Sequence, residues 1–165
     1  MPAYRVRPIG PAALAGLRET DDAGLPCLPR TDPEGGAPLR CCLRRSAPGE
    51  LIALVSYAPL RRWAAERGVR PGAYDEQGPV FIHARECGGP AGGDGYPFIR
   101  EGAPRTVRRY DGGGRIAGGR LVAPGAAAGE VFEAALAEAF ADPAVALVHI
   151  RAVEYGCFLF EVRRP

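Results

Sequence analysis

The strongest hydrophobic pattern in this chain lies near its C-terminal end, where residues 145–162 read VALVHIRAVEYGCFLFEV. Side chains alternate between the two faces of a β-strand, so this segment predicts two strands joined by a tight turn. A three-residue turn at 154–156 collects the large apolar side chains on one face, and a sheet normally buries one face. It also places Gly156 at the turn position that needs a positive φ.

In this register Ile150 lies opposite Phe160, Val153 opposite Cys157, and His149 opposite Glu161. The expected apolar face consists of Val148, Ile150, Phe158, Phe160 and Val162. The expected mixed face consists of His149, Arg151, Cys157 and Glu161. Two interpretations of the mixed face stay open: a solvated face with a cross-strand pair between His149 and Glu161, or a binding site.

Shorter patterns place the other elements. Strands are expected at Tyr4–Ile9, Leu39–Arg44, Leu51–Tyr57, Pro79–Ala84, Arg105–Asp111 and Arg115–Val122. Helices are expected at Pro11–Thr20, Pro59–Arg67 and Glu130–Ala141. In the last helix Phe132, Leu136 and Phe140 recur every four residues and form an apolar stripe. The strand Leu51–Tyr57 is apolar on both faces, so it is expected at the centre of its sheet.

Hairpins outnumber crossover connections in this order of elements. The sequence therefore predicts an α+β fold, with a mostly antiparallel sheet of about six or seven strands and two or three helices packed on its apolar face. A chain of 165 residues is long enough to bury one core, so residues 1–165 are expected to form a single domain. Two long segments rich in glycine and proline, 21–38 and 85–104, are expected to be functional or mobile loops.

Composition excludes several classes of function. Every basic residue is an arginine, the net charge is only +2, and no basic stretch is interleaved with aromatic residues, so no nucleic-acid binding is expected. No run of about 18 apolar residues is present, so no membrane span is expected. The first ten residues lack the apolar core of a signal peptide, which predicts a cytoplasmic protein. Five cysteines, an odd number, argue against a complete disulfide framework.

Several short motifs occur together from Cys42 onward. They are Cys42-Leu43, Pro48-Gly49-Glu50, Leu54-Val55-Ser56-Tyr57, Gly78-Pro79-Val80-Phe81-Ile82-His83-Ala84 with Cys87, Arg109-Tyr110-Asp111, Gly114-Arg115-Ile116, Val148-His149-Ile150-Arg151 and Tyr155-Gly156-Cys157-Phe158-Leu159-Phe160. In this combination the chain resembles a bacterial family of uncharacterised function, DUF1203. The resemblance implies a small bacterial domain without an established activity, so it transfers no catalytic residue.

Thiol and imidazole groups suggest a metal site or a reactive thiol as one alternative. Cys42, His83 and Cys87 form a candidate zinc ligand set, since zinc prefers sulfur and nitrogen ligands. His83 and Cys87 can share an ion only if the chain bends directly after Ala84, because four extended residues span about 13 Å. Cys41 and Cys42 are expected to point to opposite faces of a strand, so only one of them can join the site.

The leading hypothesis is a small-molecule or anion-binding domain that needs no cofactor. Its ligand-binding residues are His83, His149, Arg151 and Glu161, covered by the two glycine- and proline-rich loops. Catalysis at such a pocket is left open, and no catalytic residue is assigned. A second hypothesis is a non-enzymatic interaction module, in which the mixed sheet face forms a homodimer or binds another partner.

Overall fold

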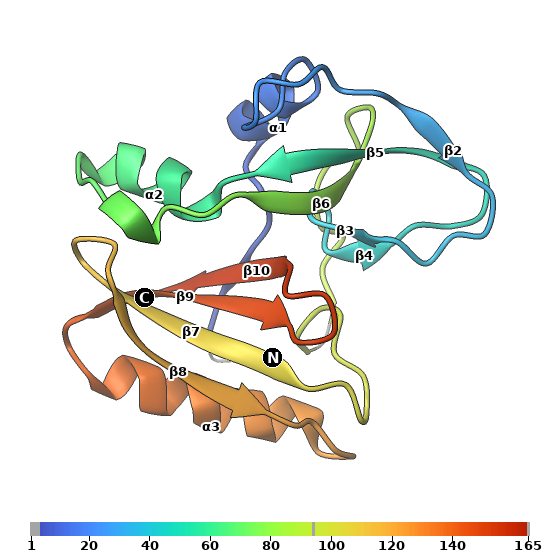
Figure 1. Cartoon of the computed structure of the whole chain (residues 1–165). Coiled ribbons are helices and arrows are strands. Elements are labelled where there is room, and N and C mark those ends of the chain that lie inside the picture. The colour runs from blue at the N-terminus through green and yellow to red at the C-terminus, as the bar shows by residue number, and fades with distance from the viewer. Residues whose placement is uncertain (1–3, 94, 165) are drawn as a thin grey trace.

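The computed structural model of the protein describes residues 4–93 and 95–164, whose strands form two five-stranded sheets (Figure 1). The C-terminal sheet has the order β1 (Val6–Arg7), β10 (Phe158–Arg163), β9 (Val145–Ala152), β7 (Arg105–Asp111) and β8 (Ile116–Val122). The N-terminal sheet has the order β2 (Arg30–Asp32), β5 (Glu50–Tyr57), β6 (Gly78–His83), β3 (Pro38–Leu39) and β4 (Arg44–Arg45). Among the named strands all pairs are antiparallel except β3 with β6.

The predicted α+β class with mostly antiparallel pairing is confirmed. The strands divide between two sheets, however, instead of forming one sheet of six or seven strands. Strand β5 pairs with β2 on one side and β6 on the other, as expected for a central strand. Strands β7 to β10 pair with one another and with β1, so the long segment 85–104 separates the two sheets along the chain.

The helices complete a layered arrangement around the C-terminal sheet. They are α1 (Pro11–Leu17), α2 (Pro59–Arg67), the 3-10 turn η1 (Gly72–Tyr74) and α3 (Ala128–Ala141). Helix α3 covers one face of the C-terminal sheet, whereas α2 and the N-terminal sheet lie over the other face (Figure 1). Trp63 of α2 packs beside Tyr110 and Leu147 of that second face. Within the described residues, no helix is both long enough and apolar enough to cross a bilayer.

The C-terminal hairpin has the predicted register over most of its length. Ile150 pairs with Phe160 and His149 with Glu161. Close to the turn the pairing differs, because the Ala152 amide donates to the Cys157 carbonyl at 2.9 Å. The predicted pairing of Val153 with Cys157 is therefore wrong, and the turn contains four residues, 153–156. Gly156 has the expected positive φ of 70°.

A β-bulge at Leu159 restores the predicted register after this longer turn. The pairing shifts between Phe158 and Phe160, so one extra residue is accommodated on β10. An extra residue turns the preceding side chain to the other face of the strand. Phe158 therefore lies on the same face of the sheet as His149, with 5.1 Å between their ring centroids. Leu159 points to the other face and joins the core under α3. The predicted place of Phe158 on the apolar face beside Ile150 was therefore wrong.

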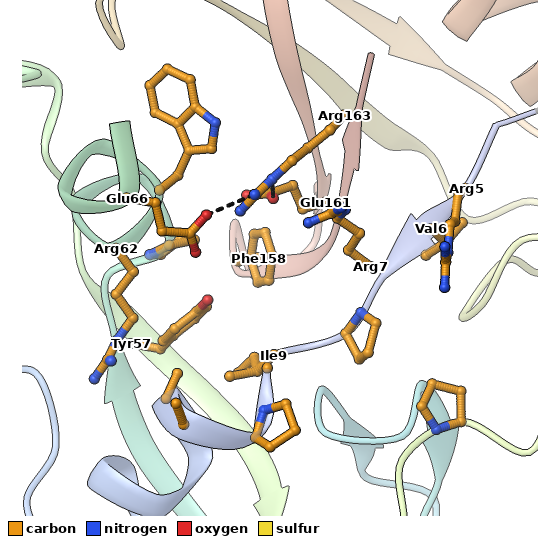
Figure 2. A pocket seen from close by; sticks show the side chains of 18 of the residues that line it. Arg5, Val6, Arg7, Ile9, Tyr57, Arg62, Glu66, Phe158, Glu161 and Arg163 are labelled. Carbon is orange, nitrogen blue, oxygen red and sulfur yellow. Dashed lines mark hydrogen bonds and ion pairs between the residues drawn. The ribbon is translucent and has the colours of Figure 1, made fainter. Parts of the chain in front are cut away.

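A cleft of about 720 Å³ lies between the layers. It is bounded by residues 5–13, by the end of β5 and the start of α2, and by β10 (Figure 2). Tyr57, Phe158 and Glu161 are among the residues that line it. Chain segments that are far apart in the sequence thus share one concave surface.

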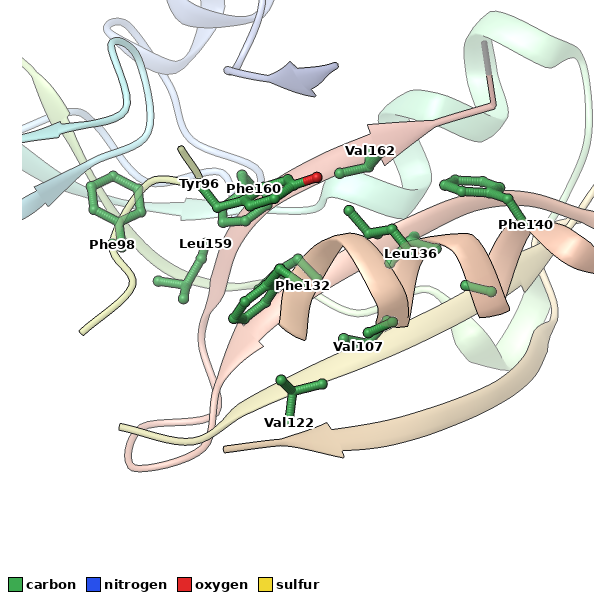
Figure 3. Close-up of a cluster of buried hydrophobic side chains, with 14 of the residues drawn as sticks. Tyr96, Phe98, Val107, Val122, Phe132, Leu136, Phe140, Leu159, Phe160 and Val162 are labelled. Carbon is green, nitrogen blue, oxygen red and sulfur yellow. The ribbon is translucent and has the colours of Figure 1, made fainter. Parts of the chain in front are cut away.

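The main core lies between α3 and the C-terminal sheet (Figure 3). Phe132 and Leu136 of α3 are fully buried against Val107, Phe160 and Val162 of the sheet. The loop 85–104 also contributes Tyr96 and Phe98 to this core, although its glycine and proline content prevents regular structure.

Two expectations for the N-terminal half need correction. Residues 40–43, predicted as part of a strand, form a turn between β3 and β4. The segment 21–38 is not an isolated loop, because β2 within it pairs with β5. The turn at 40–43 is the more important difference, since it changes where the adjacent cysteines point.

Candidate metal centre

Three cysteines and one histidine meet at the end of the N-terminal sheet. The residues are Cys41, Cys42, His83 and Cys87, and one ligand atom from each lies within 4.8 Å of all the others. Three of the four residues are buried, and Cys87 is half-buried. The sequence-based alternative of Cys42, His83 and Cys87 is thus contained in this cluster, with Cys41 as a fourth member.

The turn between β3 and β4 explains why both adjacent thiols join the cluster. The Leu43 amide donates to the Leu39 carbonyl at 2.8 Å, which closes a tight reversal around the two cysteines. Leu43 itself has a positive φ of 60°. Opposite orientation of neighbouring side chains holds only in extended backbone, so the expectation that Cys41 and Cys42 point to opposite faces was wrong.

Strand pairing brings this turn to His83. Leu39 pairs with Phe81 of β6, and the Arg40 amide donates to the Phe81 carbonyl at 2.9 Å. His83 ends the same strand, so it lies beside the turn. The chain bends at Ala84 and Arg85, and this bend returns Cys87 to the cluster. The bend that the sequence required for a shared site is present.

The imidazole of His83 has its two nitrogens in different environments. Nδ1 lies 3.3 Å from Cys41 Sγ and 3.7 Å from Cys42 Sγ. Nε2 lies 3.3 Å from Glu50 Oε1 and 3.1 Å from a guanidinium nitrogen of Arg44. Arg44 already donates to Glu50 in a bidentate pair, at 2.5 and 3.0 Å, so we assign the Nε2 proton to a hydrogen bond with Glu50. This tautomer leaves the Nδ1 lone pair facing the thiols.

Glu50 is a well-held second partner for that histidine. The Arg44 guanidinium and the Ala47 amide, which donates at 2.7 Å, lower the pKa of Glu50 to about 2. The carboxylate is therefore ionised at neutral pH. A carboxylate that accepts the outer N–H of a histidine fixes the ring and raises its basicity toward a metal.

The two adjacent thiols differ in acidity because they share a hydrogen bond. Donation by Cys41 lowers the pKa of Cys42, and the Arg44 amide and the Arg44 charge add to this effect. The same hydrogen bond, with burial, raises the pKa of Cys41. These opposite shifts favour a thiolate at Cys42 over a thiolate at Cys41. A cation would displace the Cys41 thiol proton.

The other predicted ligand-binding residues lie in different surroundings. His149 Nε2 lies 3.1 Å from Glu161 Oε2, so the predicted cross-strand pair is confirmed. His149 is fully buried and Glu161 is 7% exposed, so the interpretation as a solvated face was wrong. Arg151 donates to the Gly156 carbonyl at 3.0 Å and lies 3.6 Å from Glu76. Among the described residues, no hydrogen bond or ion pair joins His83 to any of these three.

Electrostatics keep the His149–Glu161 pair in one protonation state. Burial lowers the pKa of His149, more than the hydrogen bond with Glu161 raises it. Burial alone would raise the pKa of Glu161, but His149 and Arg163 outweigh it and lower the pKa. At neutral pH the pair is a neutral imidazole donating to a carboxylate. Glu161 lines the cleft of Figure 2, whereas neither His149 nor His83 lines it.

Sequence reasoning missed three members of the metal centre: Cys41, Arg44 and Glu50. The strand expected at Leu39–Arg44 points Cys41 and Cys42 to opposite faces, so the sequence predicts only one of them at the site. Glu50 was noted only as part of the Pro48-Gly49-Glu50 turn. One signal was available in the sequence. The Pro48-Gly49-Glu50 turn follows Cys41 and Cys42 closely, and a chain that reverses there can bring Glu50 back beside the two cysteines.

Comparison with known proteins gives one family and no relative of known function. The family described as "Protein of unknown function (DUF1203)" matches residues 36–164. This chain belongs to the DUF1203 family. All four residues of the candidate metal centre, with Arg44 and Glu50, fall inside the matched region, whereas β1, α1 and β2 precede it. Neither a curated protein nor a solved structure matches the chain.

Proposed function

We propose that this DUF1203 chain is a zinc-binding domain, with Cys41, Cys42, His83 and Cys87 as the ligands. The observation that carries the proposal is the convergence of four ligand atoms within 4.8 Å of one another. A tetrahedral zinc ion with sulfur ligands near 2.3 Å and nitrogen near 2.0 Å separates its ligand atoms by about 3.5–3.8 Å. The cluster therefore needs to contract by about an ångström at most.

The donor set favours zinc over harder cations. Three thiols and one imidazole are soft or borderline ligands, whereas magnesium and calcium select oxygen. The arrangement of Glu50 behind His83 is the usual support for a zinc-bound imidazole. All five cysteines are free, which is compatible with the reducing cytoplasm predicted from the sequence.

A set of four protein ligands indicates that the proposed zinc ion stabilises the fold. Zinc sites with four protein ligands are closed and hold the fold, whereas catalytic sites keep a position for water or substrate. Here the ion would connect the β3–β4 turn, the end of β6 and the start of the 85–104 loop. That loop carries Tyr96 and Phe98 into the main core, so the ion would also fix the connection between the two sheets.

The sequence-based hypothesis of a pocket built on His83, His149, Arg151 and Glu161 stays a prediction, as does a homodimer. The geometry supports the zinc centre better, because His83 already has its contacts there and His149 is enclosed with Glu161. A small-molecule site is better argued from other residues, described in the next subsection.

The test is zinc stoichiometry and affinity in purified, reduced protein. We expect one zinc ion per chain that resists a chelator of micromolar affinity, and a thiolate-to-metal absorption band after substitution by cobalt. Cys42→Ser should abolish this binding, whereas Cys27→Ser and Cys157→Ser, which alter cysteines outside the cluster, should preserve it. Glu50→Gln should weaken zinc affinity about 10–100-fold, the usual effect of losing an outer partner.

Two results would overturn the proposal. One is wild-type protein that takes up no zinc under reducing conditions. The other is equal uptake by Cys42→Ser and wild type, which would place the ion elsewhere. Folding of each variant is checked by circular dichroism before metal is added.

A further inference from the structure

The cleft between the layers combines an aromatic floor with unpaired positive charge. Its volume of about 720 Å³ lies within the range of small-molecule sites, about 300–1,000 Å³. Lining residues come from the N-terminal segment, β5, α2 and β10 (Figure 2). The cleft lies apart from the zinc ligands, since none of the four lines it.

The floor of the cleft is aromatic. Tyr57 and Phe158 each expose only a small part of their surface, and their ring centroids lie 5.6 Å apart at an angle of 60°. Ile9 and Trp63 also line the cleft and are almost completely buried. A planar ring placed on this floor would bury apolar area and gain edge-to-face contacts.

One buried donor in the wall, the Trp63 indole nitrogen, has no hydrogen-bond partner among the described residues. Burial and the nearby Glu161 carboxylate raise the pKa of Tyr57, so its hydroxyl keeps its proton at neutral pH. Buried or half-buried donors without acceptors are uncommon in folded proteins. A ligand that carries acceptor atoms would supply what the wall lacks.

The acidic residues of the cleft are already paired. Arg163 lies 2.5 Å from Glu161 and 2.7 Å from Glu66, and Glu161 also accepts from His149. Arg62 is paired in turn with Asp22 at 2.8 Å. Each of these carboxylates is therefore already held by a partner, although Glu161 and Glu66 share the single positive charge of Arg163.

The remaining cations are Arg5 and Arg7. They lie two residues apart at β1 and both line the cleft. Neither has an ion pair or a side-chain hydrogen bond with any residue in the ranges 4–93 and 95–164. Figure 2 shows Arg7 extending from β1 toward Glu161. Guanidinium groups bind carboxylates and phosphates through paired N–H donors.

From these contacts we infer that the cleft binds a small aromatic anion, with its ring on Tyr57 and Phe158 and its carboxylate or phosphate against Arg7 and Arg5. Both groups are anionic and present acceptor oxygens that the paired N–H donors of arginine can bind. The site is independent of the zinc centre and does not require it.

The test uses anilinonaphthalene sulfonate, a fluorescent aromatic anion, and its uncharged parent, phenylnaphthylamine. We expect the anion to bind wild-type protein in the micromolar range. Arg7→Ala should weaken that binding at least about tenfold, the effect of losing a charge-assisted hydrogen bond. Binding of the uncharged parent should change little. The matched control is Arg120→Ala, which should bind like wild type. Arg120 is an exposed arginine of the edge strand β8 and pairs with Glu138 of α3.

Competition identifies the anionic group. Displacement by benzoate indicates a carboxylate ligand, and displacement by phenyl phosphate indicates a phosphate ligand; either supports the inference. Equal displacement by inorganic phosphate, which lacks a ring, would overturn the aromatic part. Unchanged binding of the anion by Arg7→Ala, or by the double variant with Arg5→Ala, would overturn the assignment of the charge.

Discussion

His149 and Glu161 form a hydrogen-bonded pair between the layers, where water is excluded. The rings of Tyr110 and Phe158 lie 4.9 and 5.1 Å from the imidazole and hold it in place. Nδ1 of His149 has no partner among the described residues, so the ring donates only through Nε2. A neutral histidine enclosed in this way makes folding sensitive to pH, because it must gain a proton when the chain unfolds in acid.

The pH dependence can be stated with its sign. The pKa of His149 is lowered in the folded state, so the unfolded chain binds more protons below the ordinary histidine pKa of about 6.5. The stabilising contribution is present above that pH and is lost as pH falls. We expect wild-type protein to lose more unfolding free energy between pH 7.5 and 5.5 than His149→Gln, which keeps an N–H donor for Glu161.

Urea unfolding at the two pH values measures this difference. His83 is the other histidine of the chain and is present in both proteins, so it does not contribute to the difference between them. Equal pH dependence in wild type and His149→Gln would show that His149 is not the group that titrates.

At the scale of single elements, α3 and β10 illustrate two kinds of local determinant. The stripe of Phe132, Leu136 and Phe140 predicts both the helix and its buried face, because a 3.6-residue period survives in any tertiary setting. The sequence predicts the two faces of β10 less reliably, because one extra residue in the strand reverses which side chains point to each face. The bulge at Leu159 is such a residue, and it moved Phe158 to the side of His149.

Leu136→Ala tests how much α3 contributes by covering the sheet. Leu136 is fully buried at the centre of the main core (Figure 3). Truncation of such a leucine typically costs 2–5 kcal/mol, through lost burial and the cavity that remains. We expect a loss of about that size in urea unfolding. Glu138→Ala, on the exposed side of the same helix, should cost less than about 1 kcal/mol. A similar loss for both variants would contradict this account of the helix.

At the scale of the whole molecule, the proposed zinc ion joins the N-terminal sheet to the start of the long segment that leads into the C-terminal sheet. The two sheets are separated along the sequence by residues 85–104, and Cys87 lies at the beginning of this segment. A ligand that binds only the folded protein stabilises it in proportion to the logarithm of its concentration over its dissociation constant. Removal of the ion should therefore lower the stability of the entire fold.

Chelation measures this global effect. Zinc at about 100 times its dissociation constant adds about 2.7 kcal/mol, which raises the Tm of a domain of this size by about 5–10 °C. We expect a chelator to lower the Tm of zinc-loaded wild type by that amount, in a thermal scan followed by circular dichroism. Cys42→Ser, without the site, should show no change. A chelator effect of equal size in both proteins would mean that the stabilising ion is bound elsewhere.

The sequence by itself determined the fold class, the helix α3 and the place of β5 between two other strands. These features depend on the local periodicity of apolar residues, which is written directly in the chain. Only the tertiary structure decided that the strands form two sheets, that Cys41 and Cys42 turn to the same side, and that Arg7, Tyr57 and Phe158 line one cleft. Such features depend on which distant strands pair and where a turn or bulge adds one residue, and a local pattern carries no information about either.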